Sequence, residues 1–324
     1  AADGYIKSNT DDLYKLSEAE QNFQRREAFY GVELVPDTRR LAMMSAMLRG
    51  IESNVVLGDT LSPTGQNLPK SDVILSNPPF GTRKGGGNPT RDDFTFPTSN
   101  KQLAFLQHIY RGLKPGGRAA VVLPDNVLFE AGVGAEIRRD LMDKCNLHTI
   151  LRLPTGIFYA HGVKTNVLFF TRGTTDKGNT DQIWFYDLRT NMPNFGKLTP
   201  FTIDTLVPFA AVYGDQPDGS ATRTEGDWAF TADQTERTSE TSRWRCFSRD
   251  HIRDTKGDSL DITWLKDADA VDAASLPEPD VLAAEAMGEL SEALRELDSL
   301  MTALGHSDEA QAQKDLLANV LGLG

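Results

Sequence analysis

The sequence predicts an α/β protein with an open, doubly wound, mostly parallel sheet, and two patterns support this fold class. Short runs rich in β-branched and aromatic residues alternate, over the first 190 residues, with stretches whose apolar residues recur at helical spacing. This alternation is typical of repeated βα units. Several of the runs are apolar almost throughout, as in strands that are covered on both faces. Right-handed crossovers between such units place the strands side by side and mostly parallel.

The N-terminal part of the chain contains three short apolar runs that we expect to be buried strands. They cover residues 29–34, 54–58 and 72–76. The expected helices cover residues 17–28 and 36–48, and residues 1–7 resemble the end of another helix. The helix at 17–28 begins with the capping-box spacing of Ser17 and Glu20, and the helix at 36–48 begins with Pro36.

A segment without apolar periodicity follows the third strand. Residues 81–100 include three consecutive glycines and two prolines. We expect a mobile loop there, since long loops beside sites are usually functional or disordered. Regular elements resume at residue 101. The expected helices cover residues 101–113 and 134–144, and the expected strands cover residues 119–123, 148–153, 163–171 and 183–188.

The periodicity weakens beyond residue 190, and we expect three parts in the chain. Residues 1–190 form the α/β domain, residues 191–275 an irregular surface extension, and residues 276–324 a C-terminal helical region. Apolar residues recur on one face of a long helix from Val281 onward. This stripe fits core packing and docking on the helices of another subunit equally well.

Composition indicates a soluble protein of the cytoplasm. The 324 residues are 39% hydrophobic and 25% charged, and no apolar run reaches 18 residues, so we expect neither a membrane span nor a secretory signal. Cys145 and Cys246 lie far apart and have no histidine at metal-ligand spacing, so we expect no disulfide framework and no metal site. The net charge of −12 argues against a broad grip on DNA phosphates by this chain alone.

The residues after the third expected strand form the most informative motif. Asn77, Pro78, Pro79 and Phe80 end the apolar run abruptly. Two successive prolines supply no backbone N–H and fix φ at about −65°, so the carbonyl groups here are not consumed by a sheet or a helix. Ligand crevices of α/β sheets lie at the carboxyl ends of parallel strands. There, the Asn77 side-chain oxygen and the Pro78 carbonyl can both accept from one NH2 group.

Two acceptors on one NH2 group suit the methylation of an exocyclic amine. They favour a more tetrahedral nitrogen, whose lone pair then points at a sulfonium methyl group. A base inside a duplex must be flipped out to reach such a site, and Phe80 offers a flat apolar face on which it can stack. The simpler interpretation of the motif is a Pro-Pro turn that ends a core strand.

Two acidic residues at strand ends are candidates for binding the cofactor that donates the methyl group. Glu33 ends the strand at 29–34, where dinucleotide-binding folds hold a ribose diol. Asp59 follows the next strand, where it can accept a hydrogen bond from an adenine amine. The glycine-rich turn that receives the amino-acid portion of such a cofactor is absent from these residues.

Seven stretches, in a constant order, resemble one protein family. They are FYGVEL (29–34), NVVLGD (54–59), SNPPFG (76–81), LKPGGRAAVVLP (113–124), LPTGIF (153–158), GVKTNVLFF (162–170) and WFYDLR (184–189). Together they resemble the modification subunit of type I restriction-modification enzymes, which are N6-adenine DNA methyltransferases that use S-adenosyl-L-methionine. The resemblance implies an S-adenosylmethionine-dependent methyltransferase domain over residues 1–190 and continues more loosely to the terminal helix.

Carried over by position, the resemblance assigns both sites and the partners. The catalytic residues it implies are Asn77, Pro78, Pro79 and Phe80. The cofactor-binding residues it implies are Glu33, Asp59, Leu103 and Phe105. The resemblance also implies DNA as substrate and three kinds of protein partner: a specificity subunit, a second modification subunit, and a restriction and translocase subunit.

The sequence departs from the family pattern at its start. Family members carry an N-terminal helical domain and the glycine-rich cofactor motif ahead of the Asn-Pro-Pro-Phe motif, whereas these residues begin just after that motif. We therefore expect the natural protein to be longer and this fragment to bind the cofactor poorly or not at all. Two alternatives stay open: a methyltransferase acting on N5 of protein glutamine, and a non-catalytic scaffold subunit of a DNA-binding assembly.

Overall fold

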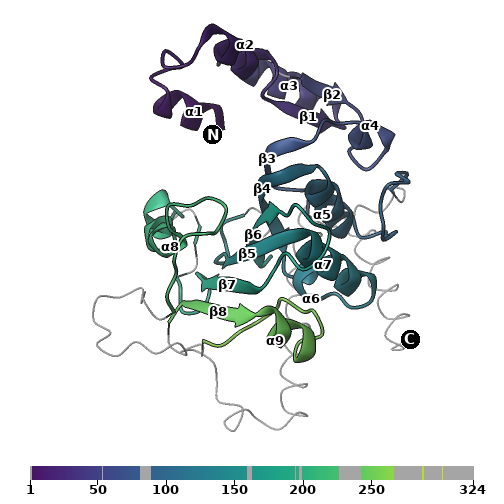
Figure 1. The fold of residues 1–324 in the computed structure, drawn as a ribbon, viewed down its shortest axis with the longest axis vertical. Helices are drawn as coiled ribbons and strands as arrows, with labels where there is room; N and C mark the ends of the chain where they lie inside the picture. The colour runs from purple at the N-terminus through teal and green to yellow at the C-terminus, as the bar shows by residue number, and fades with distance from the viewer. Residues whose placement is uncertain are drawn as a thin grey trace. The chain divides into compact units, whose positions relative to one another are not determined.

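The chain divides into two compact units, Ala1–Asp267 and Ala268–Gly324. The computed structural model describes residues 2–52, 54–80, 89–158, 163–193, 195–196, 199–225 and 242–265, together with Met287 and Met301. The helix expected from Val281 therefore lies outside the described residues, apart from Met287 and Met301, which are both helical. The strands and helices labelled in Figure 1 all belong to the first unit.

Within the described residues the strands form two sheets (Figure 1). β1 (Tyr30–Glu33) and β2 (Asn54–Leu57) pair in parallel as a two-stranded sheet. The six-stranded sheet has the order β3-β4-β6-β5-β7-β8. Its strands are β3 (Ser71–Ser76), β4 (Leu113–Pro124), β5 (Cys145–Arg152), β6 (Thr165–Arg172), β7 (Gln182–Asp187) and β8 (Trp244–Ser248). β3, β4, β5 and β7 run in one direction, while β6 and β8 run antiparallel to their neighbours.

Helices cover both faces of the six-stranded sheet. Figure 1 shows α5 and α7 on one side of it and α8 on the other. The helices are α1 (Ala2–Asn9), α2 (Glu18–Arg26), α3 (Pro36–Met47), α4 (Pro63–Gln66), α5 (Lys101–Arg111), α6 (Asn126–Phe129), α7 (Val133–Lys144), α8 (Val207–Tyr213) and α9 (Arg249–Asp254), with a 3-10 turn η1 (Ile203–Leu206) before α8. The arrangement confirms the expected α/β fold class, with a sheet that is mixed but mostly parallel in direction.

The central strands are buried on both faces, as their apolar runs predict. Along β7, Ile183 and Phe185 belong to the core beneath α5 and α7, while the alternate residues Trp184 and Tyr186 belong to the core beneath α8. Side chains on a strand point alternately to opposite faces. A strand inside this sheet therefore has no polar face, and its sequence reads as a continuous apolar run.

The N-terminal elements form where the sequence predicts them. The capping box of α2 is present: the Ser17 hydroxyl accepts from the Glu20 N–H at 3.4 Å, and the Glu20 carboxylate accepts from the Ser17 N–H at 2.8 Å. The expectation that the first strands are buried is wrong, because Tyr30 of β1 is 48% exposed, Val56 of β2 44% and Leu75 of β3 61%. The β1-β2 sheet is two strands wide, and α3 beside it buries none of its own side chains.

The segment expected to be an irregular surface extension contributes to the sheet and the core. β8 pairs with β7 from Gln182↔Ser248 to Tyr186↔Trp244. Two further residues, Leu260 and Ile262, are buried in the main core. Periodicity could not reveal this, since β8 is five residues long and its partner strand lies more than 50 residues earlier.

A buried carboxylate fastens this segment to the rest of the unit. Asp258 is 1% exposed and has a φ of 64°, and its carboxylate accepts from the Arg139 guanidinium at 2.7 and 2.9 Å. A terminal nitrogen of Arg249 lies 2.7 Å from the other carboxylate oxygen of Asp258. Arg138, also 1% exposed, donates to the Asp258 carbonyl.

We predict that Asp258→Asn destabilises the protein by about 3 kcal/mol, because it leaves the largely buried Arg249 without its charged partner. Asparagine tolerates the positive φ, so the backbone conformation is retained. Asp254→Asn is the matched control, since its carboxylate pairs with the exposed Arg253 and surface pairs contribute little. Urea unfolding followed by circular dichroism measures both. Equal urea midpoints for the two variants would contradict the stabilising role assigned to Asp258.

Candidate functional site

The Asn-Pro-Pro corner lies at the carboxyl end of β3, on the edge of the six-stranded sheet. Ser76, the last residue of β3, pairs with Val121 of β4. Pro78 is buried, whereas the neighbouring Asn77 is exposed. Within the described residues, the Asn77 side chain has no hydrogen-bond partner. The buried proline thus fixes the corner against the domain, and the amide of Asn77 stays available to a ligand.

A second aromatic ring accompanies Phe80. Phe158, six residues beyond the end of β5, meets Phe80 edge-to-face, with ring centroids 5.5 Å apart and an interplanar angle of 86°. Both side chains are half-buried. Sequence reasoning noted the stretch 153–158 only as part of a resemblance and assigned Phe158 no role. The available signal was an aromatic residue in a turn that follows a buried strand.

Glu33 and Asp59 lie at neighbouring strand ends. Glu33 pairs with Leu57 in the β1-β2 register, and Asp59 follows two residues later. Each carboxylate uses one oxygen locally: Glu33 accepts from the Val35 N–H and Asp59 from the Leu61 N–H, both at 2.8 Å. The second oxygen of each accepts no hydrogen bond from the described residues. This pair can therefore still accept hydrogen bonds from hydroxyl or amine groups of a ligand.

The two residues expected from α5 have different surroundings. Phe105 packs against a small cluster that contains Leu61 and therefore lies beside the turn after Asp59. Leu103 is 0% exposed and belongs to the main core. The expectation that Leu103 lines a cofactor pocket is therefore not supported, because a side chain without exposed surface cannot contact a ligand.

Residues 89–100 are held in place by a buried arginine, contrary to the expectation of a mobile loop; residues 81–88 lie outside the described residues. Arg91 donates two hydrogen bonds to the Asp93 carboxylate, at 2.7 and 2.8 Å, and a third to the Thr60 carbonyl at 3.2 Å. It also lies 2.6 Å from Nδ1 of His108. Arg91 thereby joins this segment to α5 and to the turn after Asp59.

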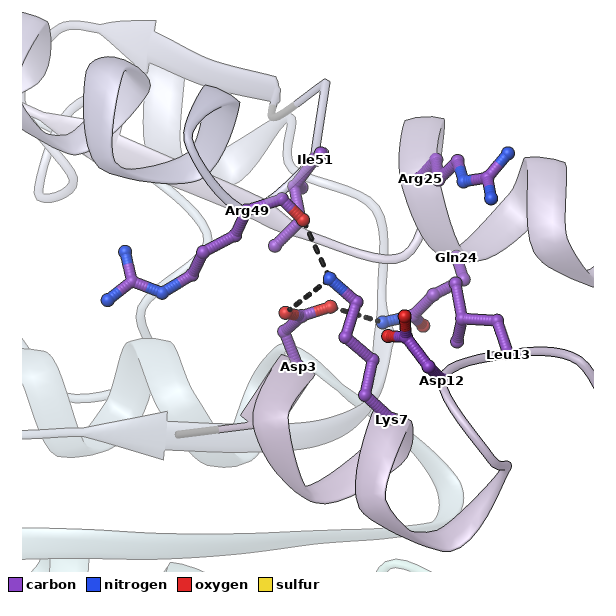
Figure 2. A pocket seen from close by; sticks show the side chains of 9 residues that line it. Asp3, Lys7, Asp12, Leu13, Gln24, Arg25, Arg49 and Ile51 are labelled. Carbon is purple, nitrogen blue, oxygen red and sulfur yellow. Dashed lines mark hydrogen bonds and ion pairs between the residues drawn. The ribbon is translucent and has the colours of Figure 1, made fainter.

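A separate cavity of about 170 Å³ lies among α1, α2 and α3, and none of the expected site residues lines it (Figure 2). Three of its polar side chains are paired: Lys7 donates to the Arg49 carbonyl at 2.7 Å and lies 3.2 Å from the Asp3 carboxylate. Gln24 donates to the other oxygen of Asp3 at 3.3 Å. These contacts tie α1 to α2 and to the end of α3, which is a structural role.

The described residues lack two features of other kinds of site. No three of their His, Cys, Asp or Glu side chains gather closely enough to hold a metal ion. None of the helices in that part of the chain combines the length and apolarity needed to cross a bilayer.

A family model described as N-6 DNA Methylase matches residues 9–241, which is more than half of the chain. The chain belongs to the N-6 DNA methylase family. A second model, described as the C-terminal domain of the type I restriction enzyme methylase subunit, matches residues 276–319. These matches confirm the resemblance to type I modification subunits that the motifs indicated.

Curated relatives of the chain agree with the family model. The type I restriction enzyme EcoKI methylase subunit of Escherichia coli K12 is 60% identical over 99% of the chain. The StySPI methylase subunit of Salmonella potsdam is 59% identical over the same share. The chain spans 64% of the length of each of these relatives.

Solved structures confirm the methyltransferase fold of this family member. The crystal structure of the type I restriction enzyme EcoKI M protein is 58% identical with a TM-score of 0.78, and the match covers 98% of this chain and 68% of that one. A structure from work on complex assembly and conformational transition of the type I restriction-modification system is 25% identical with a TM-score of 0.59. That match covers 91% of this chain and 58% of the other.

Two histidines, the half-buried His108 and the buried His148, are kept neutral. Burial, together with the charge of Arg91, lowers the pKa of His108 from 6.5 to about 4. Burial, together with the charge of Arg223, lowers the pKa of His148 from 6.5 to about 3. A neutral His108 can accept a hydrogen bond from Arg91 through Nδ1, whereas a protonated one would repel it.

We predict that stability falls as the pH is lowered from 7 to 5, because histidines of the unfolded chain take up protons near pH 6.5 while His108 and His148 stay neutral in the folded state. Each contributes a loss of about 2 kcal/mol over this interval. Urea unfolding at the two pH values measures the sum. His108→Gln retains a hydrogen-bond acceptor and should reduce the fall by about half; a fall of unchanged size would refute the role of His108.

Proposed function

We propose that this chain is part of the modification subunit of a type I restriction-modification enzyme, which transfers a methyl group from S-adenosyl-L-methionine to N6 of adenine in DNA. The observation that carries the proposal is the exposed Asn77 beside the buried Pro78 at the carboxyl end of β3. Ligand crevices of α/β sheets lie at this edge. The names of the similar type I methylase subunits and the family description N-6 DNA Methylase support this proposal.

The corner supplies the acceptors that the reaction needs. The Asn77 side-chain oxygen and the Pro78 carbonyl accept hydrogen bonds from the two hydrogens of the adenine amine. The nitrogen lone pair is then directed away from the ring and toward the methyl donor, so that positioning and oriented dipoles lower the barrier.

In this proposal, two aromatic side chains receive the extruded base. Phe80 offers a ring on which adenine stacks, and Phe158 provides a second aromatic surface at the same place, with the two ring centroids 5.5 Å apart. Stacking on aromatic rings compensates for the stacking that a flipped base loses in the duplex.

Glu33 and Asp59 fit the nucleoside portion of S-adenosyl-L-methionine. Each has one carboxylate oxygen left over after its local hydrogen bond, and the two residues follow neighbouring parallel strands. Glu33 would hold the ribose hydroxyls and Asp59 the adenine amine, with Phe105 beside the Asp59 turn. When bound, the cofactor supplies the electrophilic methyl group.

DNA and other subunits are the partners that this function requires. The net charge of −12 favours a separate specificity subunit as the main contact to DNA phosphates. The other partners in the proposal are the specificity subunit, a second modification subunit and the restriction and translocase subunit. Residues 276–324 would dock on them, and residues 276–319 match the C-terminal domain of the type I methylase subunit. Such an assembly acts in the cytoplasm.

We predict that Asn77→Ala lowers adenine methylation by about 100-fold or more, because it removes one of the two acceptors of the amine. The assay uses the complete protein with its specificity subunit and measures labelled methyl groups in DNA. Asn67→Ala, an exposed asparagine outside the corner, is the matched control and should keep the full rate.

Binding of the cofactor and assembly with the specificity subunit should survive in Asn77→Ala. Label that enters protein rather than DNA would favour a glutamine methyltransferase instead. Absence of any transfer by the wild-type assembly would favour a scaffold.

A further inference from the structure

We propose that Arg189 is a positioning residue for target-base binding. Paired with Asp125, it joins Leu153 to Thr165, the two ends of the β5–β6 connection that contains Phe158 (the Phe158 segment). The inference rests on the proposed function, because it assigns Phe158 to the bound base. Arg189 itself touches neither Phe80 nor Phe158 through any contact in the described residues, so its effect would be transmitted through the backbone.

The Arg189 guanidinium binds both ends of the Phe158 segment. Its Nε donates to the Leu153 carbonyl at 3.0 Å, and one terminal nitrogen donates to the Thr165 carbonyl at 2.8 Å. The Leu153 N–H also donates to the Thr165 carbonyl, at 2.9 Å. Leu153 comes directly after β5 and Thr165 begins β6, so Phe158 lies in the connection that these bonds close.

Asp125 fixes the guanidinium in that position. Its two carboxylate oxygens accept from the two terminal nitrogens of Arg189 at 2.8 and 2.9 Å, and Asn166 donates to it at 2.7 Å. The side chains of Arg189 and Asp125 are only 9% and 19% exposed. Burial opposes ionisation of Asp125, but the hydrogen bonds from Arg189 and Asn166 outweigh it and hold its pKa below the ordinary value.

The backbone of Arg189 is fixed as well. The fully buried Asp187, at the end of β7, accepts from the N–H groups of Arg189 and Thr190, both at 2.8 Å. The backbone of Arg189 is therefore held in a defined turn. Its planar guanidinium can donate to both oxygens of Asp125 and also to the Leu153 and Thr165 carbonyls. A lysine cannot reproduce this geometry, because its ammonium group is a point charge without a fork.

The Arg189–Asp125 pair lies at the same edge of the sheet as the Asn-Pro-Pro corner. β3, β4, β5 and β7 run in the same direction, so Asn77, Asp125, Leu153 and Asp187 all lie at the carboxyl edge of one sheet. At that edge, Phe158 meets Phe80. Anchoring the segment that carries Phe158 thus controls how the second aromatic surface faces the first.

The test is Arg189→Lys in the complete protein with its specificity subunit. We expect kcat/KM for DNA to fall at least about tenfold, a loss typical of a misplaced binding group. The KM for S-adenosyl-L-methionine should stay within about twofold, since the cofactor residues lie on other strands. With 2-aminopurine in place of the methylated adenine, the fluorescence change on binding should differ from that of wild type, which a loss of stability alone would not produce.

Arg139→Lys is the matched control. Arg139 also donates two hydrogen bonds to a buried aspartate, Asp258, but to a single carboxylate oxygen, from α7 and without contact to the Phe158 segment. This variant likewise loses an arginine–aspartate pair and should keep kcat/KM for DNA. If Arg189→Lys and Arg139→Lys affect kcat/KM equally, Arg189 serves only stability and the proposal is overturned.

A double-mutant cycle provides the second measurement. Phe158→Ala should reproduce the DNA-specific loss, and adding Arg189→Lys to it should have little further effect, because both changes act on one contact. Additive losses would overturn the proposal, and Asp125→Asn replaces Arg189→Lys in the cycle if the latter does not fold. Asn77→Ala separates the two hypotheses: if that variant keeps full activity the proposed function fails, whatever the result for Arg189.

Discussion

The common direction of β3, β4, β5 and β7 is the constraint on which the candidate site depends. These strands are far apart in sequence, yet parallel alignment places all of their carboxyl ends at one edge of the sheet. Along β4, β5 and β7 the apolar side chains are buried on both faces, so the register of these strands is fixed by packing. The Asn77 corner and the Phe158 segment meet because of this alignment.

Charged groups are buried at this edge, and their pairing makes it rigid. An isolated buried ion is costly, whereas one whose hydrogen-bonding capacity is filled holds its neighbours in a defined geometry. Arg189 donates two hydrogen bonds to the Asp125 carboxylate and two more to the Leu153 and Thr165 carbonyls. Arg91 acts similarly between Asp93, Thr60 and α5. Both arginines lie in connections between regular elements, where backbone groups have no partners in a sheet or helix.

The N-terminal elements show how far sequence pattern can be trusted. Apolar runs located β1, β2 and β3 correctly but predicted burial that the structure does not have, since Leu75 is 61% exposed. An apolar run shows that a strand carries side chains suited to burial. Those side chains become buried only where another helix or sheet packs over the strand. The same limit applies to Leu103: its position on α5 was predicted, but whether it faced a ligand or the core depended on what packs against that helix.

The sequence by itself determined the strands and the longer helices of residues 1–190, the capping box of α2 and the position of the Asn77 corner, because these depend on local backbone geometry and on side-chain spacing within one element. Only the tertiary structure decided that β8 joins the sheet, that residues 89–100 are anchored by Arg91, that Phe158 meets Phe80 and that Arg189 pairs with Asp125. Each of these depends on contacts between residues distant in sequence, and such contacts leave no period or motif within a single stretch of chain.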